Sequence, residues 1–311
     1  MTITPKQRER RKQGLGASDV AAVIGRDPWR SAYDLFIEKT GMAETEDDPG
    51  RFEIANALEP VILQLASKKL GLPVVKPTAT FQLPEGMPGC GVVMANVDGM
   101  VEKFARGQPI VEAKSTCLEG EWGEEGSDQV PDRVLIQAQI QMICAGSQVA
   151  YVARLLSKFG FSFSMYRVPL NRDLAVELLR RADDFWTNHV QTGVPPEITP
   201  TNMPSLDLLA MVDREDRAVT IPDHVVESYV ALNEACKAAE KAKDDAKAVL
   251  LAALGTAERG VGAGMQVRHG LVSTSRFDAK AFEAAHPDTF NLFKRESGYR
   301  TLRVTKAKEN K

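Results

Sequence analysis

The alternation of apolar and polar residues is clearest between Gly91 and Ser115, where two runs rich in β-branched residues flank a short polar turn. Such runs predict two consecutive β-strands. Side chains along a strand alternate between its two faces, so Glu112 and Lys114 are expected to project from the same face. Asp98 ends the first run, immediately before a glycine. The pattern therefore predicts two carboxylates and one ammonium group close together at one end of a sheet.

Apolar residues at helical spacing occur before and after these strands. Two further alternating runs, joined by the short turn SKFG, predict a β-hairpin. Strands with helices on both sides in the sequence predict an α/β or α+β fold with a mixed central sheet. The expected helices cover residues 18–25, 31–41, 55–71, 131–145 and 172–192, and the hairpin strands cover 148–156 and 161–168.

The stretch GVPPEITPTNMPS holds four prolines and divides the chain by composition. Proline-rich segments of this kind are typical of linkers. Residues 194–205 are therefore expected to join a first domain, 1–193, to a C-terminal extension, 206–311.

The extension is rich in Ala, Lys and Glu and predicts one long helix over residues 225–254. A Gly-rich hairpin is expected over 260–277, and then a short helix, broken at Pro287, and a strand, together spanning 279–305. Its clustered basic residues fit a DNA path, a subunit contact or a solvated surface, and the sequence does not choose among the three. They are Arg268, Arg276, Lys294, Arg295, Arg300 and Arg303.

Composition places the chain among ordinary globular proteins. It has 311 residues, of which 43% are hydrophobic and 26% are charged. The formal net charge is −3, so the molecule as a whole is not a polycation. If it binds nucleic acid, it must do so through a local basic patch or an internal channel.

The cysteines and the longest apolar runs exclude several further classes. The four cysteines, Cys90, Cys117, Cys144 and Cys236, are far apart and form no C-x-x-C pair. This spacing argues against a zinc site or an iron–sulfur cluster and fits free thiols in a reducing compartment. No apolar run approaches the ~18 residues of a membrane span, and no signal-peptide core is present at the N-terminus. A cytoplasmic protein without a membrane partner is expected.

The trio of Asp98, Glu112 and Lys114 suits a hard divalent cation. Mg²⁺ prefers oxygen ligands and is commonly held by one or two carboxylates together with a phosphate oxygen. A neighbouring lysine can orient an attacking water or stabilise charge on a phosphate in the transition state. The competing interpretation is a solvated face or surface ion pair. A glycosidase pair of carboxylates fits poorly, because it gives Lys114 no task.

The N-terminal segment offers a candidate anion site. Ser18 is suited to cap a helix that Gly25 ends, and a helix N-terminus has free N–H groups and a positive dipole. Arg11, within a basic run, would add a full charge, with Arg10 as a competitor for that position. The simpler interpretation makes Ser18 a cap and the basic run a solvated arm.

Two polar residues fall on apolar helix faces. Glu59 shares a face with apolar neighbours and needs a partner, or else belongs to a capping box that begins at Asn56. Gln139 lies on the face of Leu135 and Met142. A buried amide at that position requires hydrogen bonds, which an active-site carboxylate or backbone groups would supply.

Four blocks of sequence, in this order, resemble the YqaJ-type viral recombinase family, whose members are related to phage lambda exonuclease and to the PD-(D/E)xK nucleases. The resemblance covers roughly residues 11 to 190. The blocks are GLGASDVAAVIGRDPWRSAYDLFIEKTG (14–41), ANALEPVILQLASKKLG (55–71), ANVDGMV with IVEAKS, and IQAQIQMICAG (136–146).

The resemblance implies the PD-(D/E)xK core fold and a set of site residues. Asp98 and Glu112 would bind the metal together with the backbone carbonyl of Ala113, and Glu59 is a further candidate ligand. The resemblance also assigns catalytic roles to Lys114 and, as the last active-site element, to Gln139. It implies that Arg11 and Ser18 hold the 5′-terminal phosphate of DNA.

The sequence therefore predicts a Mg²⁺-dependent 5′→3′ exonuclease on double-stranded DNA ends, with Mn²⁺ as a substitute metal. By resemblance it would leave 3′ overhangs for phage-type homologous recombination, work with a single-strand annealing protein and form a homotrimeric ring. Two alternatives remain open. One is an endonuclease on the same core, which would cut closed circles, and the other is a non-catalytic module that binds DNA ends.

Overall fold

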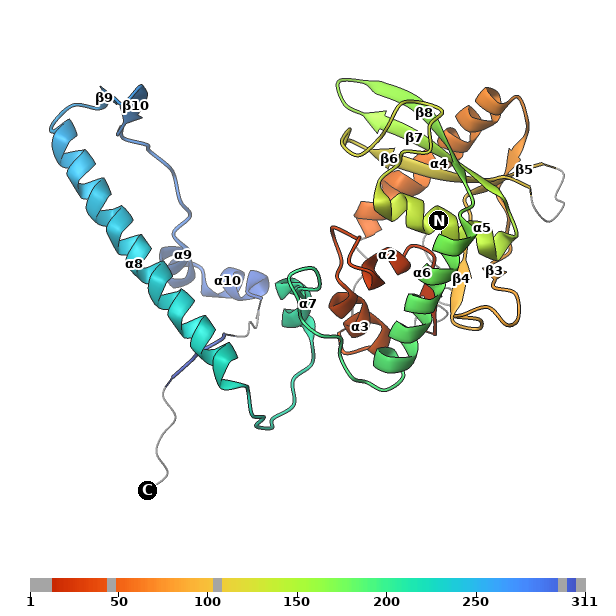
Figure 1. The fold of residues 1–311 in the computed structure, drawn as a ribbon. Coiled ribbons are helices and arrows are strands. Elements are labelled where there is room, and N and C mark those ends of the chain that lie inside the picture. The colour runs from red at the N-terminus through yellow and green to blue at the C-terminus, as the bar shows by residue number, and fades with distance from the viewer. Residues whose placement is uncertain (1–12, 44–48, 103–107, 296–300, 306–311) are drawn as a thin grey trace. The chain divides into compact units, whose positions relative to one another are not determined.

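The computed structural model describes residues 13–43, 49–102, 108–295 and 301–305 (Figure 1). The chain forms two compact units, Met1–Arg214 and Glu215–Lys311. Each unit is described separately below. Within the described residues, no helix has both the length and the apolar character needed to cross a membrane.

A five-stranded mixed sheet organises the first unit, with strand order β2-β5-β6-β7-β8 (Figure 1). β6 and β7 are parallel, and the other neighbouring pairs are antiparallel. This arrangement, with helices on its faces, confirms the predicted fold class. The strands are β2 (Val74–Val75), β5 (Gly99–Val101), β6 (Ile110–Thr116), β7 (Val149–Ser157) and β8 (Phe161–Pro169).

Two helices cover opposite faces of this sheet. On one face, α4 (Pro49–Leu70) packs Ile62 and Ala66 against Val111 of β6. On the other, α5 (Asp132–Ala145) packs Ala138 against Ile110. Because neighbouring residues of β6 face opposite ways, each helix receives every second side chain of the strand. Glu112 and Lys114 therefore lie on the α5 side of the sheet.

The helix α5 also connects the two parallel strands. A parallel pair cannot be closed by a tight turn and needs a crossover, which is commonly helical. Here residues 117–131 leave the end of β6, and α5 then returns the chain to the start of β7. The crossover places the polar residues of α5 directly beside the polar residues of β6.

A second core lies on the far side of α5. Ile136, Ile140 and Ile143 of α5 pack there with residues of the short helices before the sheet and of α6. A small sheet with strand order β1-β4-β3 completes this layer. Its elements are β1 (Leu15–Gly16), α2 (Val20–Val23), α3 (Ala32–Thr40), β3 (Phe81–Gln82), β4 (Val93–Ala95), α6 (Arg172–Phe185) and the π-helical turn η1 (Trp186–Val190).

The proline-rich stretch at 194–205 runs along α3. The backbone N–H of Tyr33 donates to Asn202 Oδ1 at 2.8 Å, and the N–H of Ser205 donates to Asp34 Oδ1 at 2.7 Å. After it, α7 (Leu206–Met211) buries Leu208 in the core of the first unit. The contact boundary therefore falls after Arg214, whereas the sequence places a linker at 194–205.

The second unit contains one long helix, α8 (Asp223–Leu254), and a hairpin of β9 (Arg259–Gly262) and β10 (Met265–Arg268). The hairpin strands are shorter than the predicted 260–277. As predicted, Pro287 divides the following helix, giving α9 (Ala279–Ala285) and α10 (Pro287–Phe293). The described residues 301–305 do not form the expected strand.

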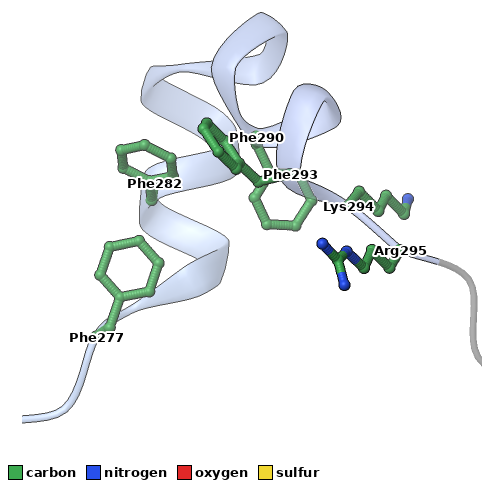
Figure 2. Close-up of a pocket in the computed structure, with 6 residues that line it drawn as sticks. All are labelled: Phe277, Phe282, Phe290, Phe293, Lys294 and Arg295. Atoms are coloured by element: carbon green, nitrogen blue, oxygen red, sulfur yellow. The ribbon is translucent and has the colours of Figure 1, made fainter. Parts of the chain in front are cut away.

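Four phenylalanines of α9, α10 and the residue stretch before them gather around an open pocket of about 490 Å³ (Figure 2). They are Phe277, Phe282, Phe290 and Phe293, and Lys294 and Arg295 lie at its edge.

Candidate active site

Glu112 is the centre of the polar cluster on β6. Its side chain is almost completely buried, at 3% exposure. One carboxylate oxygen, Oε1, lies 2.7 Å from Lys114 Nζ and accepts a 2.7 Å hydrogen bond from Gln137 Nε2. The other oxygen, Oε2, accepts a 2.6 Å hydrogen bond from Gln141 Nε2. Donors on both oxygens compensate the cost of burying this carboxylate.

Lys114 is fixed at two points. Besides its ion pair with Glu112, its ammonium group donates to Gln137 Oε1 at 2.9 Å. Gln137 thus contacts both members of the pair, with its amide nitrogen on Glu112 and its oxygen on Lys114. The lysine side chain is one-fifth exposed, so the charge is oriented by the protein and still reaches solvent.

Asp98 joins the cluster from the turn between β4 and β5. Its Oδ2 accepts a 2.9 Å hydrogen bond from the backbone N–H of Ala113, the residue between Glu112 and Lys114. Burial, followed by the negative charge of Glu112, raises the pKa of Asp98 to about 8. The Ala113 N–H and the Lys114 charge act in the opposite direction, and Glu59 makes a smaller contribution that raises the pKa. Two carboxyl groups therefore compete for ionisation in one buried place.

Glu59 lies near enough to Asp98 to affect the pKa of Asp98. Its side chain is 18% exposed and forms an ion pair with Lys76. Because α4 begins at Pro49, Asn56 is inside the helix and the predicted capping box is not at a helix start. The structure thus brings Glu59 toward the Asp98 end of the cluster.

Gln139 is the exception among the sequence-predicted catalytic residues. Its Nε2 donates to the carbonyl of Pro169 at 2.9 Å, and its Oε1 accepts from the backbone N–H of Asn171 at 2.8 Å. These bonds hold the chain where β8 leads into α6. The structure therefore does not bring Gln139 to Glu112, and its contacts match the alternative interpretation, a core glutamine bonded to backbone.

The two glutamines that the sequence reasoning missed are Gln137 and Gln141. Residues four apart share one face of a helix, and a residue midway between them points away. Gln137 and Gln141 therefore both reach Glu112, while Gln139 cannot. Helical spacing across this Gln-rich segment was the signal that could have identified the pair.

The structure does not give Ser18 the capping role on which the predicted anion site depends. Ser18 is exposed, and α2 is a four-residue helix with Asp19 at its N-cap position and no side-chain capping bond. Ser18 therefore does not cap this helix as expected. Arg11 and Arg10 lie outside the described residues.

Asp19, next to Ser18, is buried in a network of cations. Its carboxylate lies 2.7 Å from the Arg30 guanidinium and 2.8 Å from Lys39 Nζ, and it accepts a hydrogen bond from the Gly16 N–H. Burial opposes ionisation, but the charges of Lys39 and Arg30 outweigh it and hold the pKa of Asp19 well below its usual range. Arg30 also pairs with Glu38 at 3.0 Å.

Few side-chain oxygens that could bind a metal ion lie at the end of β6. Among the residues that the structure describes, no group of three or more His, Cys, Asp or Glu side chains is arranged to hold a metal ion. Asp98 and Glu112 provide two carboxylates, with Lys114 beside them. This arrangement can bind a phosphate-bearing ligand through its ammonium group and move a proton at a carboxyl group with a raised pKa.

Residues 8–148 match the model of the YqaJ-like viral recombinase domain. The resemblance predicted from the four sequence blocks is confirmed by this match. Among curated proteins, the chain is 23% identical over 316 residues to the uncharacterized protein YqaJ of Bacillus subtilis strain 168. That alignment covers 94% of this chain and 92% of the relative.

Solved structures of two exonucleases are also similar. An alkaline exonuclease, LHK-Exo, from Laribacter hongkongensis is 16% identical, with a TM-score of 0.45 over 61% of this chain and 94% of that one. A phage-related exonuclease from Haemophilus somnus 129PT is 12% identical, with a TM-score of 0.41 over 58% of this chain and 96% of that one.

Proposed function

We propose that this protein is a metal-dependent deoxyribonuclease that degrades double-stranded DNA from its ends. The observation that carries the proposal is the buried Glu112–Lys114 pair, held by Gln137 and Gln141, with Asp98 bound to the intervening backbone N–H. This cluster lies inside the segment that matches a recombinase domain. A purely structural ion pair would need neither the second carboxylate nor two dedicated amides.

The donor set fits a hard divalent cation. Asp98 and Glu112 would hold Mg²⁺, or Mn²⁺ in its place, with the Ala113 carbonyl and Glu59 as further candidate ligands. Two buried carboxylates repel each other, which is one reason why the pKa of Asp98 is raised to about 8. A cation between them would relieve that repulsion. When bound, the metal would neutralise charge on the phosphate and make a coordinated water more acidic.

The protein groups have separate tasks in phosphodiester hydrolysis. Lys114 orients the attacking water and stabilises the negative charge that develops on the phosphate oxygens. Gln137 fixes the Lys114 ammonium, and Gln141 keeps Glu112 in place. The water oxygen bonds to phosphorus and gives up a proton as the bond from phosphorus to the leaving oxygen breaks, and the leaving oxygen takes up a proton in turn.

The match of residues 8–148 to the YqaJ-like viral recombinase domain supports the finer proposals. Digestion would run 5′→3′, with Arg11 and Ser18 at the terminal phosphate, and would leave 3′ overhangs for a single-strand annealing protein in phage-type recombination. A homotrimeric ring would reconcile a net charge of −3 with DNA binding, because basic groups would line an internal channel. Arg11→Ala should reduce the preference for 5′-phosphorylated over 5′-hydroxyl ends.

The test is digestion of linear duplex DNA labelled separately at its 5′ and 3′ ends, in Mg²⁺, Mn²⁺ or EDTA, with a closed circle beside it. The wild type is compared with Lys114→Ala and with Lys68→Ala, which removes the same charge from an exposed site on α4. Metal-dependent loss from 5′ ends, abolished only in Lys114→Ala, supports the proposal. Cleavage of the circle indicates an endonuclease, and binding without any cleavage indicates an end-binding module.

A further inference from the structure

Arg154 lies beside the catalytic cluster. It is on β7, and its register partner on the parallel neighbour β6 is Lys114. Residues in register on neighbouring strands are about 4.8 Å apart and project from the same face. Arg154 therefore places a second positive charge beside that of Lys114, on the side of the sheet that α5 covers.

Two aromatic rings hold the Arg154 guanidinium. Its central carbon lies 5.0 Å from the centroid of the Trp122 ring and 5.6 Å from that of Tyr166. The two rings contact each other, with centroids 5.0 Å apart. Cation–π contacts hold a guanidinium group against the rings without using its N–H donors, so its terminal amino groups remain available to another partner.

No described residue provides that partner. Arg154 is only partly buried, and its Nε, which is enclosed, has no hydrogen-bond acceptor. Because Nε is shut off from solvent, the donors that an outside ligand can reach are the terminal amino groups. The ion pairs among the described residues do not include Arg154. By contrast Lys114 and Arg30, which like Arg154 are partly buried, both pair with carboxylates. A buried donor without an acceptor is costly, and a charged one more so. The terminal amino groups are therefore placed to bind an anion that comes from outside the chain.

We infer that Arg154 binds a phosphate of the DNA strand that is being cleaved, next to the phosphate at Lys114. The inference rests on the proposed nuclease function. A planar guanidinium donates two parallel hydrogen bonds to the oxygens of one phosphate, which suits a backbone contact. Two successive phosphates of the DNA strand would then contact Lys114 on β6 and Arg154 on β7. Arg154 is thus a substrate-binding residue that sets the path of the strand across the site.

The test measures DNA binding by the full-length protein in EDTA, where a metal-dependent nuclease does not cut, with a labelled duplex at several salt concentrations. Arg154→Met keeps the length and apolar stem of the side chain without its charge. Arg167→Met is the matched control, because Arg167 is an exposed arginine on β8 that points to the opposite face. Melting temperatures of all variants are recorded in parallel.

Loss of a charged contact should weaken binding by Arg154→Met roughly tenfold or more. The slope of log affinity against log salt should become shallower by about one. Arg167→Met should match the wild type in both. Equal binding and equal slopes for the two variants would overturn the inference, whatever their melting temperatures. A structural role for Arg154 would lower stability without changing the slope.

If Arg154→Met melts below the assay temperature, Arg154→Lys decides the question because it keeps one charge. It should retain the salt slope but bind several-fold more weakly, since an ammonium group lacks the planar fork. Wild-type affinity in Arg154→Lys would contradict the inference. Failure of the nuclease proposal is seen separately, as absence of metal-dependent cleavage by the wild type.

Discussion

Gln141 Nε2 donates a 2.6 Å hydrogen bond to Glu112 Oε2 and a second, 3.0 Å bond to the carbonyl of Asn96. One amide therefore ties the buried carboxylate on β6 to the segment that follows β4 and leads to Asp98. Glu112 lies on β6 and Asp98 lies in the turn before β5, so Gln141, together with the Ala113 N–H that bonds Asp98, fixes their relative position. The geometry of the site depends on α5 as much as on the sheet.

Substitution of Gln137 or Gln141 should slow cleavage, whereas substitution of Gln139 should lower stability alone. Gln137→Leu and Gln141→Leu each remove a donor to Glu112, so the rate of DNA cleavage should fall at least about tenfold. Gln139→Leu breaks bonds to Pro169 and Asn171 only. It should lower the free energy of unfolding by about 1–3 kcal/mol while leaving the cleavage rate of the folded protein unchanged. Single-turnover rates and urea unfolding measure the two effects, and a rate loss confined to Gln139→Leu would reverse our assignment.

Metal binding should be visible in stability as well as in activity. A ligand that binds only the folded state adds about 1.4 kcal/mol to the free energy of unfolding at ten times its Kd. Mg²⁺ or Mn²⁺ should therefore raise the melting temperature of the wild type. Asp98→Asn should lose most of this increase, because it removes one of two carboxylates. Each protein in EDTA, without added metal, is the reference. An equal metal-induced shift of the melting temperature in both proteins would contradict the assignment of Asp98.

Gly99 permits a close approach that positions Asp98. A Cβ atom there would lie 2.6 Å from Val74 Cγ1 and 2.9 Å from Leu63 Cδ2. Gly99→Ala should destabilise the protein by about 1–3 kcal/mol through overpacking, and it should also reduce cleavage by displacing the neighbouring carboxylate. Gly120→Ala is the control, since a Cβ at Gly120 meets nothing within 4 Å. Urea unfolding of both variants checks the prediction, and equal stabilities would refute it.

The Asp19 network should give a pH-dependent contribution to stability. The folded-state pKa of Asp19 is lowered, so the network stabilises the fold above the unfolded pKa, about 3.9, and this contribution is lost as pH falls below it. Asp19→Asn should cost about 3 kcal/mol near pH 7. The difference from wild type should shrink steadily between pH 4 and pH 3. Asp184→Asn, at an exposed site on α6, serves as the control, and a difference independent of pH would contradict the role of Asp19.

The sequence predicted the parts of the fold and site that depend on local periodicity. Alternation along β6 placed Glu112 and Lys114 on one face, and Pro287 was correctly predicted to break the last helix. Ordinary strand and helix patterns also sufficed for a mixed sheet with helices on both faces. These features follow from side-chain spacing within a single element.

Features that depend on contacts between distant segments were not accessible in this way. Which glutamine of α5 meets Glu112 depends on how the crossover helix is rotated over the sheet. The attachment of the 194–205 segment to α3 depends on Asn202 and Ser205, which look like ordinary linker residues. Arg154 lies in an apolar run, and nothing in that run indicates that Trp122, from a loop between β6 and α5, would form a cation–π contact with it.

The central claim is that the carboxylate of Glu112 takes part in cutting DNA. Glu112→Gln keeps the shape of the side chain and removes its charge, and Glu177→Gln makes the same change on an exposed surface of α6, where Glu177 pairs with Arg180 and Arg181. The measurement is the single-turnover rate of cleavage of end-labelled duplex DNA in Mg²⁺, with DNA binding recorded in EDTA.

We predict that Glu112→Gln cleaves at least about a hundredfold more slowly than the wild type, still binds the duplex and retains a cooperative melting transition, while Glu177→Gln behaves as the wild type does. A folded Glu112→Gln variant that cuts DNA at the wild-type rate would contradict the account.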